Sequence, residues 1–448
     1  MASRRRWPTV TTKRILGSLV PIAYDATRLL LGPLSLTPRG IDRVDLAYAR
    51  HFFEHSTEDC CAILPTAWGT RTFSRERVLR GLTRLEELWA ENRQPAIDGA
   101  WTSLAPTIQA GKSSWYLPSN GALTLTARMT ALLKATGIGL GEDAVASLGR
   151  DTVYVNVGQV GLTVPFLLRW LNRRPDIRPL FMLHDVIPLE TPEYVAPHAV
   201  KAHATMVDQT ARYAAGLIVT TRTAQKAIET ELERRGAKAL PTLALPLPVP
   251  SIFRGAPDPD PTLTGVPYFV ICGAVELRKN HLLLLEVWKR LYRKHGPATP
   301  HLVIAGAKGW QGDLILDRLR RSGQVSDYIH VLHGLSTPAL KRLISGARAL
   351  LMPSFIEGFG LPVVEAAVLG TPVIASDIPA HREVGHPGTT FVDPIDGPGW
   401  EAAIAALLSG EPRRLAPSPG YAELTWSDYF SSLSHFIHTI LTDQAART

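Results

Sequence analysis

Short apolar runs alternate with longer amphipathic segments through the carboxyl-terminal half of the chain, and this alternation constrains the fold more than any other feature. Each apolar run has the length of a strand, and each amphipathic segment has the residue spacing of a helix. The expected strands include YFVICGAVE, PHLVIAG, YIHVLHG and residues 349–352, with the expected helices between them. Strands that alternate with helices predict a parallel, doubly wound sheet.

The stretch from Arg348 to Val384 is the most informative part of this alternation. It is expected to form a strand from Ala349 to Met352, a Gly-rich turn, a short helix and a second strand. In the turn EGFGLPVVE, Pro362 suits the first turn of a helix, because its missing N–H would have no partner there. The glycines let backbone amides approach a ligand, and the free N–H groups of a helix start attract anions. The turn is therefore predicted to bind an anion.

Two carboxylates, Glu357 and Glu365, stand beside this predicted anion site. A diphosphate carried between two hydroxyl-rich sugars would explain both, because each carboxylate can accept hydrogen bonds from hydroxyls on its side. The alternative interpretation is an ordinary strand-to-helix turn with two solvated glutamates. A second element favours the diphosphate: in GAVELRKN, Gly273 can admit a phosphate, and Arg278 and Lys279 stand just before a helix.

At these residues the chain resembles the retaining glycosyltransferases of family four, the glycosyl transferases group 1, and in particular their polysaccharide-assembly members. The family signature is a glutamate, seven residues and a second glutamate, matched here by EGFGLPVVE, and its glycine, glutamate and Arg-Lys-Asn pattern is matched by GAVELRKN. The resemblance implies an α/β protein of GT-B architecture, with two Rossmann-like doubly wound domains facing across a cleft. The second domain would hold an activated nucleotide sugar, and the first would hold the acceptor.

In the second domain the resemblance implies a role for each of these residues. Glu357 would lie by the donor sugar, and Glu365 would bind the ribose of the nucleotide. Arg278 and Lys279 would stabilise the departing diphosphate, and their division of labour stays open because many relatives have the arginine directly after the glycine. The other residues expected at the nucleotide sugar come from the two turns: Gly273, Phe359, Gly360 and Leu361.

In the first domain, HDVIPLETPEY places His184 and Asp185 at the carboxyl end of an expected strand, where open α/β sheets bind ligands. The resemblance implies that His184 is a further catalytic residue that binds the transferring sugar. Asp185 is a candidate for contact with the acceptor or a phosphate, and the alternative is that it only orients the ring of His184. The pattern GIDRV is familiar in polysaccharide-assembly members, which makes Gly40 and Arg43 candidates for contact with the acceptor or the donor phosphates. A structural histidine and an ordinary helix entry are the alternative interpretations.

No cofactor and no metal are expected; the donor substrate would be a nucleotide-diphosphate sugar, GDP- or UDP-linked. Asp258 and Asp260 have the form of the acidic pair that holds manganese in metal-dependent glycosyltransferases, but they lie in a proline-rich loop rather than at a strand end. The cysteines Cys60, Cys61 and Cys272 form neither a disulfide framework nor a zinc site, which fits a reducing cytosol.

The chain of 448 residues exceeds one ordinary core, so two domains are expected. The predicted parts are an acceptor-binding domain at 1–245, a linker at 246–262, a nucleotide-sugar domain at 263–425, and a helix at 426–448 that returns to the first domain. Residues 1–250 hold 30 Lys and Arg against 22 Asp and Glu. This surplus favours peripheral contact with an anionic membrane over nucleic acid, and a solvated basic surface is the alternative. A cytoplasmic protein at the inner face of the membrane is expected.

The sequence thus predicts a retaining, metal-independent glycosyltransferase in polysaccharide biosynthesis. It would move a hexose, mannose-like, from a nucleotide-diphosphate sugar to a glycan or a lipid-linked oligosaccharide. The alternatives are a sugar-nucleotide epimerase or a phosphorylase of the same architecture, and an inactive sugar-nucleotide-binding subunit. The intact Glu357, Glu365 and basic pair argue against the inactive subunit.

Overall fold

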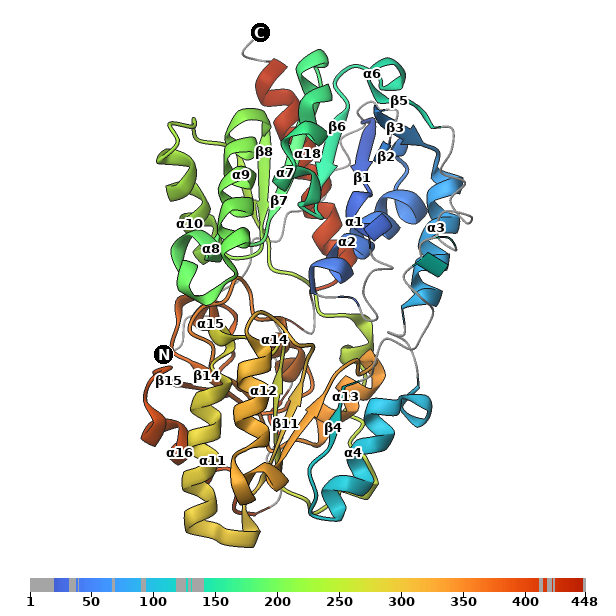
Figure 1. Ribbon diagram of the computed structural model, residues 1–448. Helices are drawn as coiled ribbons and strands as arrows, with labels where there is room; N and C mark the ends of the chain where they lie inside the picture. The colour runs from blue at the N-terminus through green and yellow to red at the C-terminus, as the bar shows by residue number, and fades with distance from the viewer. Residues whose placement is uncertain are drawn as a thin grey trace.

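Two lobes, each built on one β-sheet, make up the molecule (Figure 1). The computed structural model describes residues 20–31, 38, 40–66, 69–89, 94–117, 126–127, 130, 141–410, 414–416, 421 and 424–445. Residues 1–19, which carry part of the basic surplus of the first 250 residues, lie outside the described residues.

The first lobe is built on a sheet that has eight strands in the described part of the chain, in the order β5-β3-β2-β1-β6-β7-β8-β9. Neighbouring strands are parallel except at the pairs β2–β3 and β3–β5. The strands are β1 (Ile22–Asp25), β2 (Cys60–Thr66), β3 (Gly69–Phe73), β5 (Glu142–Asp143), β6 (Val153–Asn156), β7 (Arg178–Leu183), β8 (Gly216–Val219) and β9 (Thr242–Ala244). The helices are α1 (Thr27–Leu31), α2 (Gly40–Arg50), the π-helical turn η2 (His51–His55), α3 (Arg75–Leu88), α6 (Ala144–Ser147), α7 (Val160–Thr163), the 3-10 segments η5 (Pro165–Arg173) and η6 (Pro192–Tyr194), α8 (Ile187–Glu190), α9 (Pro197–Tyr213) and α10 (Arg222–Glu233).

The second lobe is built on a parallel sheet with the order β15-β14-β13-β10-β11-β12-β4. Its strands are β4 (Trp115–Tyr116), β10 (Tyr268–Cys272), β11 (His301–Ala305), β12 (Ile329–Leu332), β13 (Ala349–Met352), β14 (Val373–Ser376) and β15 (Thr389–Val392). Its helices are α4 (Gly99–Gln109), the 3-10 turn η9 (Leu277–Lys279), α11 (His281–His295), α12 (Gly312–Arg320), α13 (Thr337–Gly346), α14 (Leu361–Val368), α15 (Pro379–Val384) and α16 (Gly397–Ala405). The predicted α/β class, with two mainly parallel sheets, is confirmed.

The strand order changes direction at β1 in the first sheet and at β10 in the second. In the second sheet, β11 and β12 lie on one side of β10, and β13, β14 and β15 lie on the other. In the first sheet, β2 and β6 flank β1 on opposite sides. Ligands of open α/β sheets bind outside the carboxyl ends of strands at such switch points. The residues that follow β10 and β13 therefore lie where a site is expected, and Gly273 and Glu357 are among them.

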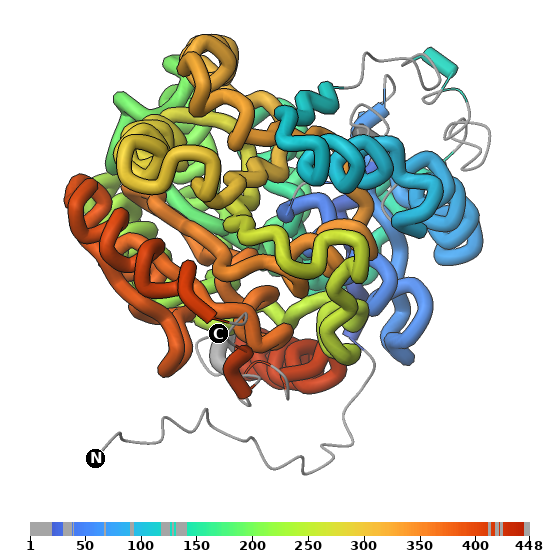
Figure 2. The backbone as a smooth tube through the Cα atoms, turned by 90° about the horizontal axis from the view of Figure 1, so that it is seen from below, coloured from blue at the N-terminus to red at the C-terminus, as the bar shows by residue number. Residues whose placement is uncertain are grey.

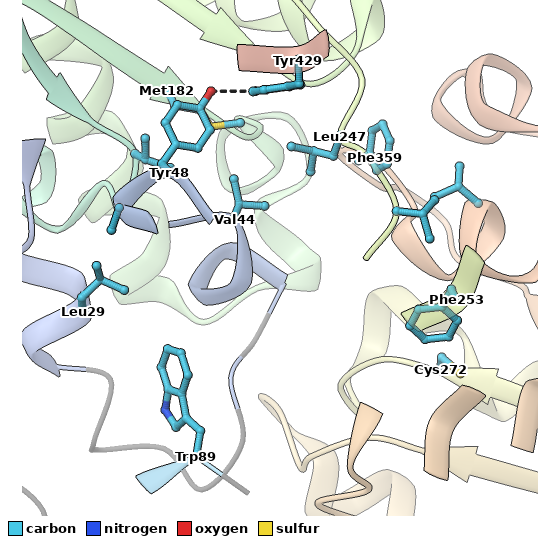
Figure 3. Close-up of a cluster of buried hydrophobic side chains, with 14 of the residues drawn as sticks. Leu29, Val44, Tyr48, Trp89, Met182, Leu247, Phe253, Cys272, Phe359 and Tyr429 are labelled. Carbon is cyan, nitrogen blue, oxygen red and sulfur yellow. Dashed lines mark hydrogen bonds between the residues drawn. The ribbon is translucent and has the colours of Figure 1, made fainter. Parts of the chain in front are cut away.

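A continuous hydrophobic cluster joins the lobes (Figure 3). It includes Tyr48 and Met182 of the first lobe and Phe359 of the second. Leu247 and Phe253, which lie in the segment predicted as the linker, are buried in the same cluster. That segment is therefore packed between the lobes rather than exposed.

The last helix, α18 (Trp426–Ala445), packs on the first lobe. The hydroxyls of Tyr48 and Tyr429 are hydrogen-bonded at 2.7 Å (Figure 3), and the ring of His51 stacks on Phe430 with centroids 3.9 Å apart. A Cβ atom on Gly216 would lie 2.5 Å from Cδ1 of Ile440, so this helix packs closely on β8. In the described part of the chain, no helix is both long and apolar enough to cross a bilayer.

One local prediction differs from the structure, and the strand β4 was not predicted. The helix expected from Thr163 to Arg173 is α7 followed by the 3-10 segment η5, because Pro165 cannot donate the hydrogen bond that a continuing α-helix needs. Strand β4 belongs to the first half of the sequence yet pairs in parallel with β12 of the second sheet. Figure 1 labels α4 beside this strand, and in Figure 2, seen from below, the segment of α4 lies against the second lobe.

Candidate functional site

Glu357 follows β13 and is buried with three side-chain donors around its carboxylate. Its Oε1 accepts hydrogen bonds from Ser354 Oγ at 2.7 Å and from Lys279 Nζ, and its Oε2 accepts from Arg278 Nη1 at 2.8 Å. Burial alone would raise the pKa of Glu357, but the charges of Lys279 and Arg278 outweigh it and hold the pKa well below its usual range. Glu357 is therefore an ionised carboxylate in a buried, charge-matched cluster.

The two cations of this cluster lie on η9, just before α11. Arg278 also pairs with Glu276 at 2.6 Å and donates to the carbonyl of Ile356 at 3.2 Å. Burial opposes its charge, but the carboxylates of Glu357 and Glu276 raise the pKa of Arg278. Burial lowers the pKa of Lys279, and Glu357 opposes that shift.

Gly273 lies at the carboxyl end of β10 with a φ of +131°, a conformation that side chains rarely adopt. A Cβ atom there would lie 3.1 Å from Lys279 Cε and 3.2 Å from its Nζ. The glycine thus gives the ammonium group room beside the strand end. The structure brings Gly273, Lys279, Arg278 and Glu357 together, as their predicted roles require.

The turn before α14 has Gly360 in the left-handed region at φ +96°, and Phe359 beside it is buried. A Cβ atom on Gly360 would lie 3.5 Å from the ring of His381, which is fully buried. His381 Nδ1 is hydrogen-bonded to the carbonyl of Ser376 at 3.0 Å, and its Nε2 has no partner among the described residues. Sequence reasoning missed His381, although its place shortly after a predicted strand is a usable signal.

The first turn of α2 lies against the first turn of α14, so the two lobes meet at the predicted nucleotide site. A Cβ atom on Gly40 would lie 3.3 Å from Leu361. Arg43 reaches Glu365 at 3.8 Å and the hydroxyl of Thr337 at 3.4 Å, and Glu365 is buried. The two first-lobe candidates are therefore beside the predicted nucleotide residues.

His184 and Asp185 follow β7 in the first lobe. His184 is buried, and burial, together with the charge of Arg28, lowers the pKa of its imidazole to about 4. Its Nε2 has no partner among the described residues. Asp185 accepts a hydrogen bond from the amide of Ile187 at 3.1 Å, and its Oδ2 would lie 2.9 Å from a Cβ atom on Gly358. Asp185 thus packs against the loop that carries Glu357.

Two buried carboxyl groups near the first switch point were not predicted. Asp25 ends β1 and accepts hydrogen bonds from the amide of Thr27 at 2.8 Å and from Asn156 Nδ2 at 2.7 Å. Its position at a strand end was a signal in the sequence. Asp45, on α2, accepts from the hydroxyl of Tyr24, and its other oxygen has no partner among the described residues. Burial raises the pKa of Asp45 to about 8.

In the described part of the chain, no group of three or more His, Cys, Asp or Glu is arranged to hold an ion. Asp258 pairs with Arg342 at 2.9 Å, and Asp260 lies 3.9 Å from the same guanidinium. These two carboxylates thus face a cation of the protein.

Residues 259–419 match the family of glycosyl transferases group 1. Among curated proteins, the chain is similar to the serotype-specific mannosyltransferase WbdA of Escherichia coli, with 28% identity over 261 residues, which is 54% of this chain and 32% of that protein. It is also similar to the O-antigen chain mannosyltransferase RfbU of Salmonella typhimurium, with 35% identity over 140 residues, which is 31% of this chain and 37% of the relative. The chain thus spans about a third of the length of these relatives.

Among solved structures, sucrose-phosphate synthase from Thermosynechococcus elongatus has the same fold, with a TM-score of 0.54 and 15% identity. The match covers 95% of this chain and 98% of that one, so both lobes are included. The GT-B architecture predicted from the sequence is confirmed.

Proposed function

We propose that this chain, which belongs through residues 259–419 to the family of glycosyl transferases group 1, is a retaining glycosyltransferase that moves a hexose from a nucleotide-diphosphate sugar to a glycan acceptor. The mannosyltransferase names of the two curated relatives support mannose as the hexose and polysaccharide assembly as the setting.

One observation carries the proposal: a buried cluster of Glu357, Arg278 and Lys279 at the switch point of the second sheet, beside the start of α14. An ion pair that only stabilises the fold would not have to lie at the switch point of a sheet. At the carboxyl ends of β10 and β13, backbone N–H groups of a helix start and two cations converge where a ligand of an open sheet binds. That combination suits a diphosphate.

In the proposed reaction, Arg278, Lys279 and the amides at the start of α14 stabilise the negative charge that develops on the departing diphosphate. Preorganised donors of this kind contribute about 3 kcal/mol each to transition-state stabilisation. The ammonium of Lys279 has three N–H groups, so it can hold Glu357 and a phosphate oxygen at once. Glu357 stays ionised beside the donor sugar.

Glu365 binds the ribose hydroxyls in this proposal, and Arg43 faces the same carboxylate from the first lobe. His184 binds the transferring sugar. Because burial holds its pKa at about 4, the imidazole is neutral at pH 7 and its unpartnered Nε2 can meet a sugar hydroxyl. The acceptor hydroxyl loses its proton to the leaving phosphate, so no protein nucleophile is required.

The acceptor is a lipid-linked oligosaccharide at the cytoplasmic face of a membrane, and the base of the donor is guanine or uracil. The basic surplus of residues 1–250 supports contact with lipid phosphates. No metal takes part in the proposed step.

The first test is binding. We expect GDP or UDP, without metal, to raise the Tm of the purified chain, because ligand at a hundredfold its Kd adds about 2.7 kcal/mol of stability. The Glu365→Ala variant should lose that shift. Absence of a shift with every nucleoside diphosphate would remove the donor site from the proposal.

The second test is transfer. The matching nucleotide sugar, GDP-mannose first, is incubated with mannose-terminated oligosaccharides, and the anomeric configuration of the product is read by NMR. Retention supports the proposal. Inversion contradicts it, and conversion of the donor without acceptor would indicate an epimerase.

A further inference from the structure

Helix α10 of the first lobe begins at a carboxylate supplied by the second lobe. Glu383 of α15 accepts hydrogen bonds from the backbone amides of Arg222 at 2.7 Å and Thr223 at 3.0 Å, and from the hydroxyl of Thr223 at 2.9 Å. The first N–H groups of a helix have no partner within it, and a negative charge near them is favourable. The residue that caps the start of a helix usually precedes it directly in the sequence, whereas Glu383 lies 160 residues after Thr223.

The residue before α10 makes a second connection between the lobes. The hydroxyl of Thr221 accepts from the amide of Ala224 at 3.0 Å and donates to the carbonyl of Gly358 at 3.0 Å. Its hydrogen bonds thus join the start of α10 to the residue directly after Glu357. A valine at this position would remove both bonds, whereas a serine would keep them.

The loop that carries Glu357 is also held on its other side. The ring of Tyr194, from η6 of the first lobe, stacks on Phe355 with centroids 5.0 Å apart and planes within 6°. Phe355 and Gly358 flank Glu357, so both flanks of this residue contact the first lobe. Asp185, directly after His184, also packs against Gly358.

Helix α15 contacts the start of α10, and in Figure 1 it lies at the edge of the second lobe that faces α8 and α10. From the same short helix, His381 packs against Gly360 at the start of α14 while Glu383 caps α10. This short helix therefore connects the predicted diphosphate site to the first-lobe residues that follow β8.

We propose that Glu383 is a positioning residue for sugar transfer: by capping α10 across the lobes, it aligns the first-lobe edge that carries His184 with the loop that carries Glu357. The inference rests on the proposed function. Glu383 contacts the protein backbone rather than substrate. Its removal therefore changes the alignment of the two lobes. The second-lobe residues that are predicted to bind the diphosphate stay in place.

The test compares Glu383→Ala with Asp143→Ala in the full chain. Asp143 caps α6 through the amides of Val145 at 3.0 Å and Ala146 at 3.2 Å, at the far end of the first lobe in Figure 1. Both variants lose a capping carboxylate and should show similar falls in Tm. We expect kcat to fall by about 10- to 100-fold in Glu383→Ala only, because a displacement on the order of 1 Å is enough for such a loss.

Affinity separates positioning from binding. The Kd for the nucleoside diphosphate should stay within about twofold of wild type in Glu383→Ala, since the loss is in transition-state alignment rather than in uniform binding. Thr221→Val should also lower kcat at unchanged Kd, and Thr221→Ser should keep wild-type kcat. Unchanged kcat in Glu383→Ala, an equal loss in Asp143→Ala, or a Kd that rises as far as kcat falls would each overturn the inference. A wild-type chain without transfer activity would instead contradict the proposed function.

Discussion

Two buried carboxyl groups, Glu357 of the second lobe and Asp45 of the first, lie near the switch points of their sheets, and their surroundings shift their pKa values in opposite directions. Glu357 of the second lobe has two cations and a hydroxyl as partners, and these hold its pKa below the usual range although burial raises it. Asp45 of the first lobe has the hydroxyl of Tyr24 on one oxygen and no partner among the described residues on the other. Burial therefore raises the pKa of Asp45 to about 8.

The difference teaches that burial does not by itself decide the charge of a carboxyl group. The positive charge of Arg28 lowers the pKa of Asp45, but the Nε of Arg28 pairs with Asp42 at 2.6 Å. The negative charges of Asp25 and Asp42 raise the pKa of Asp45 and so oppose its ionisation. At Glu357 the cations are bonded directly to the carboxylate. The second lobe thus keeps a fixed negative charge at its site, whereas the first lobe keeps a neutral acid at pH 7.

The largest expected effect comes from breaking the charged site. Glu357→Ala should lower kcat by at least about 10²-fold. It should also lower the free energy of unfolding by about 3–5 kcal/mol, because Lys279 is left buried without its carboxylate. Urea unfolding measures the second quantity. The control is Glu286→Ala, which removes an exposed pair with Lys289 and should cost less than about 1 kcal/mol. Equal costs in the two variants would contradict the description of Glu357.

At Asp45 we expect the opposite change, because Asp45→Asn should raise the free energy of unfolding relative to wild type. Asp45 has an ordinary pKa of 3.8 and a folded pKa of about 8, so between these values the folded state holds the extra proton. The wild type therefore loses stability as pH rises through this window, and asparagine does not. We expect the variant to gain on wild type by on the order of a few kcal/mol between about pH 5 and 8, measured by unfolding. Asp208→Asn, at an exposed position, should show no such trend. A constant difference across pH would contradict the raised pKa.

The loss of stability at acidic pH, called the acid limb here, tests the ionised state of Glu357 and so the contrast with Asp45. The pKa of Glu357 is lower in the folded state than its ordinary 4.5, so its contribution is present above that value and is lost as pH falls below it. The wild type should lose up to about 1.4 kcal/mol per pH unit from this group. Glu357→Gln should have a shallower acid limb than wild type, followed by Tm between about pH 5 and pH 3. Identical limbs would show that Glu357 titrates normally.

The contrast also explains which parts of the molecule were predictable from the sequence. In the second lobe, the predicted strand from Ala349 to Met352 is β13, and the predicted helix start at Leu361 is the start of α14. Strand, turn and helix there are encoded by local patterns, and the turn residues Gly273 and Gly360 have the positive φ angles for which glycine is suited. The roles of the site residues stay predictions.

What could not be predicted depends on contacts between distant segments. The two-residue strand β4 is too short to show alternation; the amide of Ser114, which precedes it, donates to His330 Nδ1 at 3.0 Å in the second lobe. Asp45 lies on an amphipathic helix, where a carboxyl group is expected on the solvent side. Its burial follows from the position of Tyr24, which no pattern of α2 contains. Likewise, nothing local to Glu383 indicates that it caps α10.

The smallest expected effect comes from removing the neutral donor of the charged site. Ser354→Ala deletes one hydrogen bond to Glu357 and leaves both cations, so the carboxylate stays ionised. We expect a loss of about 1 kcal/mol in the free energy of unfolding. Tyr24→Phe is the matched change at Asp45, and it should cost more, because that carboxyl group loses the one hydrogen-bond donor described for it. Urea unfolding of both variants at pH 7 measures the difference. If Ser354→Ala costs as much as Glu357→Ala, then the hydroxyl rather than the charges holds Glu357, and the contrast between the two lobes fails.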